Sequence, residues 1–456
     1  MKRSSNDIDK SYSIKVIVED PKSHPVCPHG PTLLFSKNNT EEVKRFFACS
    51  AYRDRKHCGF FQWADKSSNL QSTEKLEARK VEQKKFLKGI NHRKAYVLLN
   101  KIKSLGRSNR GFCHDCKLLF NACQDKRHEN HSAIIGLTDY QLEHPSEMLK
   151  PLDETKKEAQ YLFSKTSVEF IVETFRRLGY QYVICVGTPR IHEYIQSNVG
   201  HDMQSILLDL DDRFHSFFGP MEFCWYNSFN NHFFFDEAQG VFEDFLRNTR
   251  GERTVLITDP PFGGRIEPLA YTLSVINKLY MGTNKTEETL PIFWIFPYFM
   301  EPQILNYLPE FNMLDYKVNY DNHPLFQGGP KGRKNGSPVR IFTNVLPSLV
   351  KLPKGEYKFC KRCDKWVSKE NKHCHICEQC TSKNGQTYVH CKQCDRCVKP
   401  SWQHCHNCQR CAQVRHQCGL VLEFNGACLN CQRSGHKRAN CPDLLPALKN
   451  KKTVKK

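Results

Sequence analysis

The sequence predicts an α/β protein in which one Rossmann-like domain is flanked by small zinc-stabilised modules. Between about residues 150 and 350, hydrophobic strand-like runs alternate with helical segments, which is typical of a sheet covered by helices. One of these runs, residues 254–258, ends in Asp-Pro-Pro-Phe, and open α/β sheets place their ligands at such strand ends. Outside this domain, Cys-x2-Cys and His-Cys pairs recur. The 23 cysteines and 20 histidines therefore indicate zinc sites rather than disulfides.

The composition also indicates a polyanionic partner. Lys and Arg number 68 against 48 for Asp and Glu, a formal net charge of +20. An excess of positive charge of this kind favours binding to nucleic acid. No apolar run approaches the roughly 20 residues that span a bilayer, so we expect no membrane partner.

The first expected zinc module follows a polar segment, residues 1–24, which is predicted to be a flexible N-terminus. In residues 25–64, three thiols and one imidazole provide one tetrahedral zinc site: Cys27, His29, Cys49 and Cys58. The ending Gly-Phe-Phe-Gln-Trp resembles the GRF-type zinc finger, a small β-module that binds single-stranded nucleic acid. Its rings Phe60, Phe61 and Trp63 either stack on bases or form the core of the module.

A basic helical linker is predicted over residues 65–110, where Lys, Glu, Gln and Leu dominate with few helix breakers. Its basic face is either solvated or in contact with RNA. The next module, residues 111–135, has the ligands of a C2H2-type zinc finger: Cys113, Cys116, His128 and His131. Cys123 lies inside the same segment as a competing ligand.

The α/β domain, residues 150–350, contains the candidate cofactor site. A buried strand over residues 182–186 runs into a turn at Gly187 and then a helix, where Rossmann-type sheets bind nucleotide-like ligands. The next strand ends near Asp209 and Asp211, and we expect one of the two to hold a ribose hydroxyl. Residues 160–166 resemble the motif that precedes the first strand in many methyltransferases. The usual glycine motif of those enzymes has three glycines, whereas this chain has one. The candidate cofactor-binding residues are Gln160, Phe163, Ser164, Gly187, Thr188, Pro189, Arg190, Asp209, Asp211 and Asp259.

The loop after residues 254–258 is the candidate catalytic site, formed by Asp259, Pro260, Pro261 and Phe262. Two prolines remove two backbone donors, so the loop presents carbonyl oxygens and a carboxylate as acceptors. Such acceptors would hold the hydrogens of an exocyclic amine and localise its lone pair, while Phe262 stacks on the base. The tetrapeptide resembles motif IV of the S-adenosylmethionine-dependent amino-methyltransferases, which act on adenine N6, cytosine N4 or glutamine. A strand that simply ends in a proline-rich turn is the alternative.

Further strands are expected near residues 230–236 and 291–296. The domain is then predicted to end in an antiparallel pair, residues 315–321 and 339–345, as in seven-stranded methyltransferases. A flexible basic loop lies between the last two strands. It supplies the candidate RNA-binding residues Lys331, Arg333 and Lys334.

A Cys/His-rich multi-zinc region is predicted over residues 358–420. Its spacing resembles the cysteine-rich domain of the Asp-His-His-Cys palmitoyltransferases, in which zinc sites are crossed. Those enzymes need transmembrane helices, and no apolar run of this sequence is long enough to form one. The resemblance therefore implies the metal scaffold and not acyl transfer. Sixteen ligands divide into four interleaved sets: Cys360, Cys363, His373 and Cys380; Cys374, Cys377, His390 and Cys397; Cys391, Cys394, His404 and Cys411; and Cys405, Cys408, His416 and Cys418.

A CCHC zinc knuckle is predicted over residues 426–443, with the ligands Cys428, Cys431, His436 and Cys441. Such knuckles bind bases of single-stranded RNA or DNA, and a structural or protein-binding role is the alternative. The basic tail, residues 444–456, either grips phosphates or serves nuclear targeting.

The order of these modules closely resembles the family of zinc-finger CCHC-domain-containing ribosomal RNA N6-adenosine methyltransferases. The resemblance implies S-adenosyl-L-methionine as the cofactor, and the Cys/His sets counted above predict about seven structural zinc ions. It also implies RNA as the partner, with the target adenosine in large-subunit rRNA. The implied location is the nucleus or nucleolus, with the cytoplasm as a further location. Two other functions remain alternatives: an RNA-binding adaptor with an inactive methyltransferase fold, and a protein glutamine N-methyltransferase.

Overall fold

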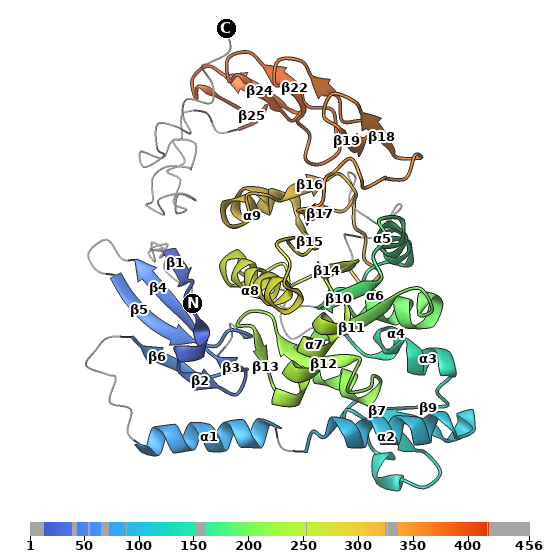
Figure 1. The fold of residues 1–456 in the computed structure, drawn as a ribbon. Helices are drawn as coiled ribbons and strands as arrows, with labels where there is room; N and C mark the ends of the chain where they lie inside the picture. Colours follow the sequence, from blue (N-terminus) through green and yellow to red (C-terminus); the bar gives the residue numbers. More distant parts are fainter. Residues whose placement is uncertain are drawn as a thin grey trace, which may run out of the picture.

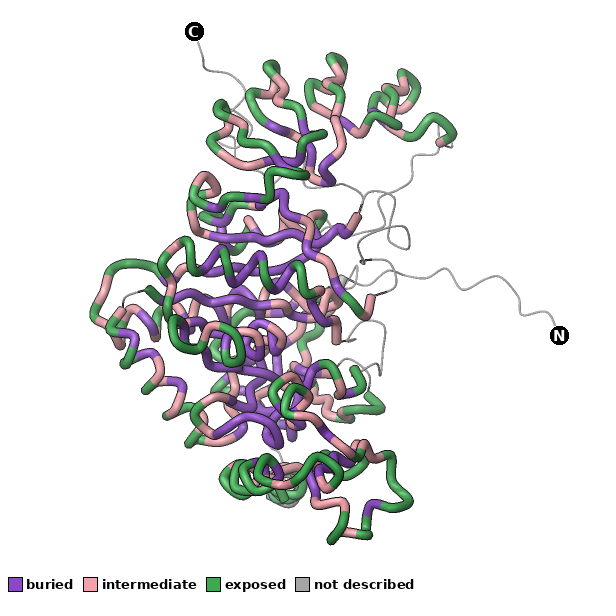
Figure 2. Tube along the Cα trace, turned by 90° about the vertical axis from the view of Figure 1, so that its right-hand side faces the viewer, coloured by how far each residue is buried: buried purple, intermediate pink, exposed green. Residues whose placement is uncertain are grey.

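The computed structural model shows a central α/β domain, a small N-terminal sheet beside it and a row of β-hairpins over one end (Figure 1). It describes residues 13–38, 43–52, 55–64, 73–87, 89–151, 160–251, 253–323, 326, 336–416 and 418. The buried part of the chain is concentrated in the central domain (Figure 2). No helix within these ranges has both the length and the apolar composition required to cross a lipid bilayer.

The central sheet has eight strands in the order β13-β12-β11-β10-β14-β15-β17-β16. The strands are β10 (Tyr182–Val186), β11 (Gln204–Asp209), β12 (Phe223–Asn227), β13 (His232–Phe233), β14 (Thr254–Thr258), β15 (Ile292–Pro297), β16 (Asn312–Leu314) and β17 (Val339–Thr343). The five strands from β12 to β15 are parallel, whereas β13, β17 and β16 pair antiparallel. The carboxyl ends of β10, β11 and β14 therefore meet at one edge, where the candidate catalytic loop follows β14.

Helices cover both faces of this sheet, which is why β14 is buried along its whole length. Val183 and Cys185 of β10 belong to the core that contains α5, whereas Ile184 and Val186 belong to the core that contains α7 and α8. The helices of the domain are α5 (Lys165–Arg177), α6 (Pro189–Tyr194), α7 (Asp236–Asn248), α8 (Ile266–Asn284) and α9 (Glu301–Tyr307).

The strand predicted over residues 315–321 is wrong in its position. Its place beside β17 is taken by the three residues of β16, and within the described part of residues 315–321 a single bridge joins Tyr320 to Phe163. Asp315 is instead used to bind the C-terminal hairpins, because its Oδ2 accepts the backbone N–H of Ser368 at 2.9 Å. Strand β12 was not predicted from the sequence. The strand predicted near residues 230–236 is present only as the two residues of β13.

The N-terminal sheet has the order β1-β4-β5-β6, with a two-stranded ribbon of β2 and β3 beside it. Its elements are β1 (Ser13–Ile17), the 3-10 helix η1 (Pro21–Ser23), β2 (Val26–Cys27), β3 (Gly30–Pro31), β4 (Leu33–Asn38), β5 (Val43–Ala48) and β6 (Phe61–Trp63). The expectation of a flexible terminus over residues 1–24 is therefore wrong from Ser13 onward. β1 pairs antiparallel with all but the first residue of β4, and its Val16 is buried.

The basic linker contains two helices, α1 (Thr73–Leu87) and α2 (His92–Lys103). α2 is more than a linker, because Leu99 and Ile102 are buried in the core of the central domain together with Phe112 of the next module. That module is a three-stranded sheet of β7 (Arg110–Cys113), β8 (Leu118–Asn121) and β9 (Ala133–Ile135), with η3 (Arg107–Asn109) and η4 (Lys126–His128) before β7 and β9. Two short helices follow it, α3 (Asp139–Glu143) and α4 (Pro145–Met148).

Four antiparallel hairpins form the Cys/His-rich region. They are β18 (Tyr357–Cys360) with β19 (Lys365–Ser368), β20 (His373–Cys374) with β21 (Gln379–Cys380), β22 (Val389–Cys391) with β23 (Arg396–Val398), and β24 (Trp402–Cys405) with β25 (Arg410–Gln413). The first hairpin is anchored to the central domain, since the side chain of Tyr357 lies in the core of that domain. The Tyr357 hydroxyl oxygen also accepts the backbone N–H of Lys317 at 3.0 Å. The other hairpins follow in a row across this end of the central domain, above β16 and α9 (Figure 1).

Candidate active site

The candidate catalytic loop begins where two parallel strands end side by side. The backbone N–H of Asp259 donates to the carbonyl of Val186 at 3.3 Å, which joins the end of β14 to the end of β10. Gly187 follows with a φ of +66°, and a Cβ added there would lie 3.4 Å from the Asp259 carbonyl oxygen. A glycine is thus favoured at this turn by its positive φ and by the close approach of the loop.

A cavity of about 150 Å³ lies at this edge of the sheet. It is lined by the predicted residues Gln160, Gly187, Pro189, Asp209, Asp211, Asp259, Pro260, Pro261 and Phe262. It is also lined by residues that the sequence reading missed, among them Tyr52, Tyr161, Tyr226, Asn227 and Phe229. Tyr52 comes from the N-terminal finger, so two modules form this one cavity.

Asp259 is half-buried at the wall of the cavity. Burial raises the pKa of Asp259 well above its usual value, and a hydrogen bond from Tyr320 opposes this rise. The Tyr320 hydroxyl donates to Asp259 Oδ1 at 3.0 Å across 61 residues of sequence. No motif in the sequence marked Tyr320, because its role depends on where the chain after β16 is placed.

Phe262 lies among aromatic side chains. Its ring centroid is 5.7 Å from Tyr161, 5.8 Å from Tyr320 and 5.9 Å from Phe326. Phe262 remains partly exposed at the cavity wall. A planar base that enters the cavity would therefore meet an aromatic ring as well as the acceptors of the loop.

The two acids near the end of β11 have different surroundings. Asp211 is paired with Arg213, whose Nε and Nη2 donate to its carboxylate at 2.8 and 2.6 Å. Asp209 accepts the backbone N–H of Asp211 at 2.9 Å and that of Leu210, and no side-chain donor to it is seen among the described residues. Burial, followed by the charge of Asp211, raises the pKa of Asp209 to about 7. A buried carboxyl group with so few donors fits the ribose hydroxyls of S-adenosylmethionine, whereas the carboxylate of Asp211 is already occupied.

Four of the predicted cofactor residues do not line the cavity. Ser164 caps α5, accepting the backbone N–H of Ser167 at 3.3 Å, and Phe163 packs on Tyr320 with ring centroids 5.3 Å apart. Thr188 is buried at the start of α6. Arg190 donates to the Phe163 carbonyl and forms an ion pair with Asp321. Arg190 therefore has a bracing role behind the cavity, because it joins α6 to the segments of Phe163 and Asp321. Lys331, Arg333 and Lys334 lie outside the described residues.

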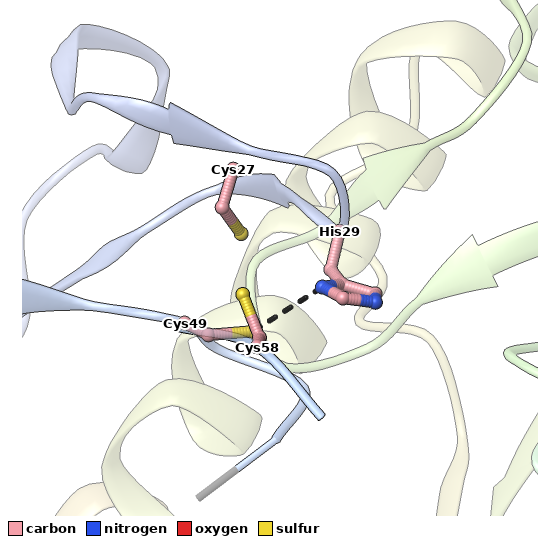
Figure 3. Close-up of side chains that lie close together, drawn as sticks. All are labelled: Cys27, His29, Cys49 and Cys58. Carbon is pink, nitrogen blue, oxygen red and sulfur yellow. Dashed lines mark hydrogen bonds between the residues drawn. The ribbon is translucent and has the colours of Figure 1, made fainter. Parts of the chain in front are cut away.

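The finger ligands converge from three places in the module: Cys27 and His29 from the end of β2 and the turn after it, Cys49 from just after β5, and Cys58 from the loop before β6 (Figure 3). Their ligand atoms all lie within 4.8 Å of one another, and Cys49 Sγ is 3.6 Å from His29 Nδ1. In a tetrahedral zinc site, Zn–S and Zn–N bonds of about 2.3 and 2.0 Å separate sulfur from nitrogen by about 3.5 Å. Three thiols and one imidazole at this spacing fit zinc.

The second module brings together Cys113, Cys116, His128 and His131 in the same way. The Nδ1 of His131 is 3.4 Å from Cys113 Sγ and 3.3 Å from Cys116 Sγ. The buried ring nitrogens of His128 have no hydrogen-bond partner among the described residues, as expected for a side chain that ligates a metal. Cys123 lies outside this group, because its thiol donates to Asn109 Oδ1 at 2.7 Å.

The C-terminal hairpins bring together the interleaved sets that the spacing predicted. Three sets converge as expected: Cys360, Cys363, His373 and Cys380; Cys374, Cys377, His390 and Cys397; and Cys391, Cys394, His404 and Cys411. In the fourth, Cys418 Sγ lies 3.4 Å from Cys405 Sγ and 3.8 Å from Cys408 Sγ, and His416 Nε2 lies 3.5 Å from Cys408 Sγ. The knuckle ligands Cys428, Cys431, His436 and Cys441 lie outside the described residues.

The aromatic end of the finger combines rings with cations. The guanidinium of Arg55 lies 4.6 Å from the centroid of Phe61, and that of Arg79 lies 4.4 Å from Phe60. Trp63 is 42% exposed. Phe60 packs against the core of the finger and Phe61 stacks on Phe46, so these two rings contribute to the module, whereas Trp63 faces solvent.

Comparison with known proteins gives two family matches within the chain. The family described as probable N6-adenine methyltransferase matches residues 154–326, and the GRF zinc finger matches residues 25–67. Similar proteins include the rRNA N(6)-adenosine-methyltransferase ZCCHC4 of Homo sapiens, 43% identical over 443 residues, which covers 95% of this chain and 85% of the relative. The protein of the same name from Xenopus tropicalis is 44% identical over 427 residues, which covers 92% and 86%. That from Mus musculus is 43% identical over 440 residues, which covers 94% and 85%.

Proposed function

The chain belongs to the ZCCHC4 family of rRNA N(6)-adenosine-methyltransferases, and on this premise we propose that it methylates N6 of an adenosine in large-subunit rRNA, using the cavity at Asp259. The observation that carries the proposal is the position of Asp259, at the carboxyl ends of the parallel strands and on the wall of a cavity shared with Asp209, Gly187 and Phe262. This is the edge at which open α/β sheets bind their ligands.

The residues of the loop favour an amine as the reacting group. Pro260 and Pro261 carry no backbone N–H, so the loop offers acceptors: the Asp259 carboxylate and the Pro260 carbonyl. Two acceptors that hold the hydrogens of an exocyclic amine leave its lone pair directed at the methyl donor. Phe262 stacks on the base, which must leave its own stack to reach the cavity. S-adenosylmethionine, when bound, supplies the activated methyl group.

Asp209 is the residue that we assign to the ribose of the cofactor, and Gln160, Gly187 and Pro189 complete that side of the cavity. The zinc content proposed for the whole chain is about seven ions. Six Cys/His groups lie in the described part of the chain, and the knuckle supplies the seventh set of ligands. Large-subunit rRNA is assembled in the nucleolus, so we propose the nucleus and nucleolus as the location.

The direct test is to incubate the purified protein with labelled S-adenosylmethionine and total RNA, then digest the RNA and identify the labelled nucleoside. N6-methyladenosine in the large-subunit rRNA supports the proposal. Label in another RNA would overturn the choice of substrate, and label in protein glutamine would overturn the class of acceptor. An RNA-binding adaptor would neither bind the cofactor in calorimetry nor transfer label.

A further inference from the structure

The N-terminal finger is fixed to the sheet edge that carries the catalytic loop. The side-chain amide of Asn227, at the end of β12, donates to the His29 carbonyl at 3.0 Å and to Ser50 Oγ at 2.8 Å. The amide of Asn230 donates to the Pro31 carbonyl at 2.7 Å. Both asparagines are buried, so these bonds hold the zinc loops of the finger in one position.

The contact between the two modules is also close at the backbone. Gly30 has a φ of +94°, and a Cβ there would lie 2.2 Å from the ring of His232. Phe86 of α1 packs against His29 of the finger and Trp225 of β12, with ring centroids 4.9 and 5.4 Å away. The finger ligand His29 thus lies against the central domain, and the adjoining strands are visible behind it in Figure 3.

A second cavity, of about 410 Å³, lies between the finger sheet and the loop that follows Phe262. Phe35, Phe46 and Tyr52 line it from the finger, while Phe229 and Arg265 line it from the central domain. Five residues line both this cavity and the catalytic cavity: Tyr52, Leu210, Asp211, Phe229 and Pro261. The two cavities are therefore neighbours, separated by shared walls.

The lining of the second cavity has the chemistry of a base-binding site. Phe35 and Phe46 are stacked with ring centroids 5.3 Å apart, and the Arg265 guanidinium lies 6.0 Å from the centroid of Phe35. The acids at this wall are balanced by cations, since Asp211 pairs with Arg213 and Asp212 with Lys117. Aromatic rings beside an arginine bind bases of single-stranded nucleic acid with little sequence preference.

We propose that this second cavity binds the base of an unpaired nucleotide next to the target adenosine, so that the finger supplies one wall of the substrate site. The inference rests on the proposed function, because it takes RNA as the substrate. In this proposal, Phe35 and Phe46 stack on the base, and Arg265 contacts the RNA strand that carries the base. The finger then contributes to the choice of the methylated adenosine, beyond general affinity for RNA.

The test is a cycle between a base of the RNA and a ring of the finger. Phe46→Leu is compared with Phe47→Leu, the neighbouring residue on β5, whose ring contacts His24 at 5.1 Å on the other face of the strand. The substrate is a short single-stranded RNA centred on the adenosine that the wild-type protein modifies. A series of such RNAs carries an abasic nucleotide at each position next to the adenosine. Affinity is measured by fluorescence anisotropy, and kcat and KM are measured separately.

We expect one abasic position to weaken binding to the wild type and to Phe47→Leu about tenfold, and to leave Phe46→Leu unchanged, since stacking on an aromatic ring contributes about that much. The KM for this RNA should rise in Phe46→Leu while kcat at saturating RNA stays the same. Equal losses in all three proteins at every abasic position would overturn the inference.

Arg265→Gln is a second variant that leaves the finger intact, in case Phe46→Leu disturbs its folding. The Arg265→Gln variant should bind the RNA more weakly, and its affinity should depend less on the salt concentration. If the wild type transfers no methyl group to RNA, the proposed function fails. The RNA is then centred on an adenosine chosen from rRNA, and the binding cycle still decides whether the cavity holds a base.

Discussion

The hydroxyl of Tyr320 donates a hydrogen bond to Asp259 Oδ1 at 3.0 Å, and it joins the chain after β16 to the catalytic loop. Tyr320 is completely buried, so its hydroxyl has a fixed position. The bond favours the ionised form of Asp259, whereas burial opposes it and keeps the pKa well above the usual value. The protonation of the carboxyl group that is proposed to hold the amine therefore depends on this contact.

Replacement of Asp259 should separate two properties of the carboxyl group. Asp259→Ala removes both acceptor oxygens, and we expect it to lower kcat by about 100-fold or more while the affinity for RNA persists. Asp259→Asn keeps one acceptor oxygen and should retain part of the activity. Because burial raises the pKa of Asp259, an increasing share of the carboxyl group ionises as the pH rises, and the wild-type rate should rise with it to a plateau. The amide of Asp259→Asn does not titrate, so kcat measured against pH should lose this limb.

Tyr320→Phe removes the donor and leaves the packing of the ring. Without the hydrogen bond, the pKa of Asp259 should rise further, because the bond opposes the effect of burial. The rising limb of the pH-rate profile should therefore move to higher pH, with RNA affinity unchanged. Tyr316→Phe is the matched control, since Tyr316 lies in the same segment but stacks on Phe170 at 3.7 Å. A limb that moved equally in both variants would contradict the assignment.

Asp209 and Asp211 should respond differently to the same substitution. Asp209→Asn is expected to lower the affinity for S-adenosylmethionine about tenfold, because the ribose loses a charged hydrogen-bond acceptor. Calorimetry measures this affinity. Asp211→Asn breaks the buried pair with Arg213, so its main effect should be a lower Tm. Weaker cofactor binding in Asp211→Asn alone would reverse the assignment.

The free energy of unfolding of the cofactor-free protein should vary with pH as Asp209 titrates. Its pKa in the folded chain is about 7, against an ordinary value of 3.8, so between these values the folded state binds more protons than the unfolded state. The contribution of Asp209 to the free energy of unfolding is present in full below the ordinary value and is lost as the pH rises to about 7. Urea unfolding over this range should show a smaller decline in Asp209→Asn than in the wild type.

Zinc content should distinguish ligand cysteines from the cysteine that competes with them in sequence. Cys116→Ser removes a member of the second zinc group and should lower the bound zinc by one ion per chain, measured by elemental analysis. Cys123→Ser is the control, because Cys123 is bonded to Asn109 and lies outside the group. Equal zinc loss in both variants would mean that the ligand set is different.

The sequence predicted the parts of the site that depend on local patterns. A glycine turn after β10, acids near the end of β11 and Asp-Pro-Pro-Phe after β14 are each set by one strand and its end. The sheet then brings all three together, because parallel strands place these ends at one edge. The interleaved Cys/His sets were also predictable, since the same spacing recurs along the sequence and each set joins two successive hairpins.

The parts that the sequence did not predict depend on contacts between distant segments. Tyr320 reaches Asp259 because β16 ends at Leu314 and the chain then turns toward the loop. Tyr52 reaches the cavity because two asparagines hold the finger against β12. The bracing role of Arg190 was likewise hidden, because its partners Phe163 and Asp321 are far apart in the chain.

The crossed sets of the C-terminal hairpins limit how this region can change in length. The hairpin of β20 and β21 gives His373 and Cys380 to the site before it, and Cys374 and Cys377 to the site after it. Loss of the whole hairpin would remove two ligands from each neighbour and leave two halves that together make one complete site. A truncation at a hairpin boundary would instead leave an incomplete set at the cut. The array can therefore gain or lose length only by whole hairpins, because only then does every remaining zinc site keep four ligands.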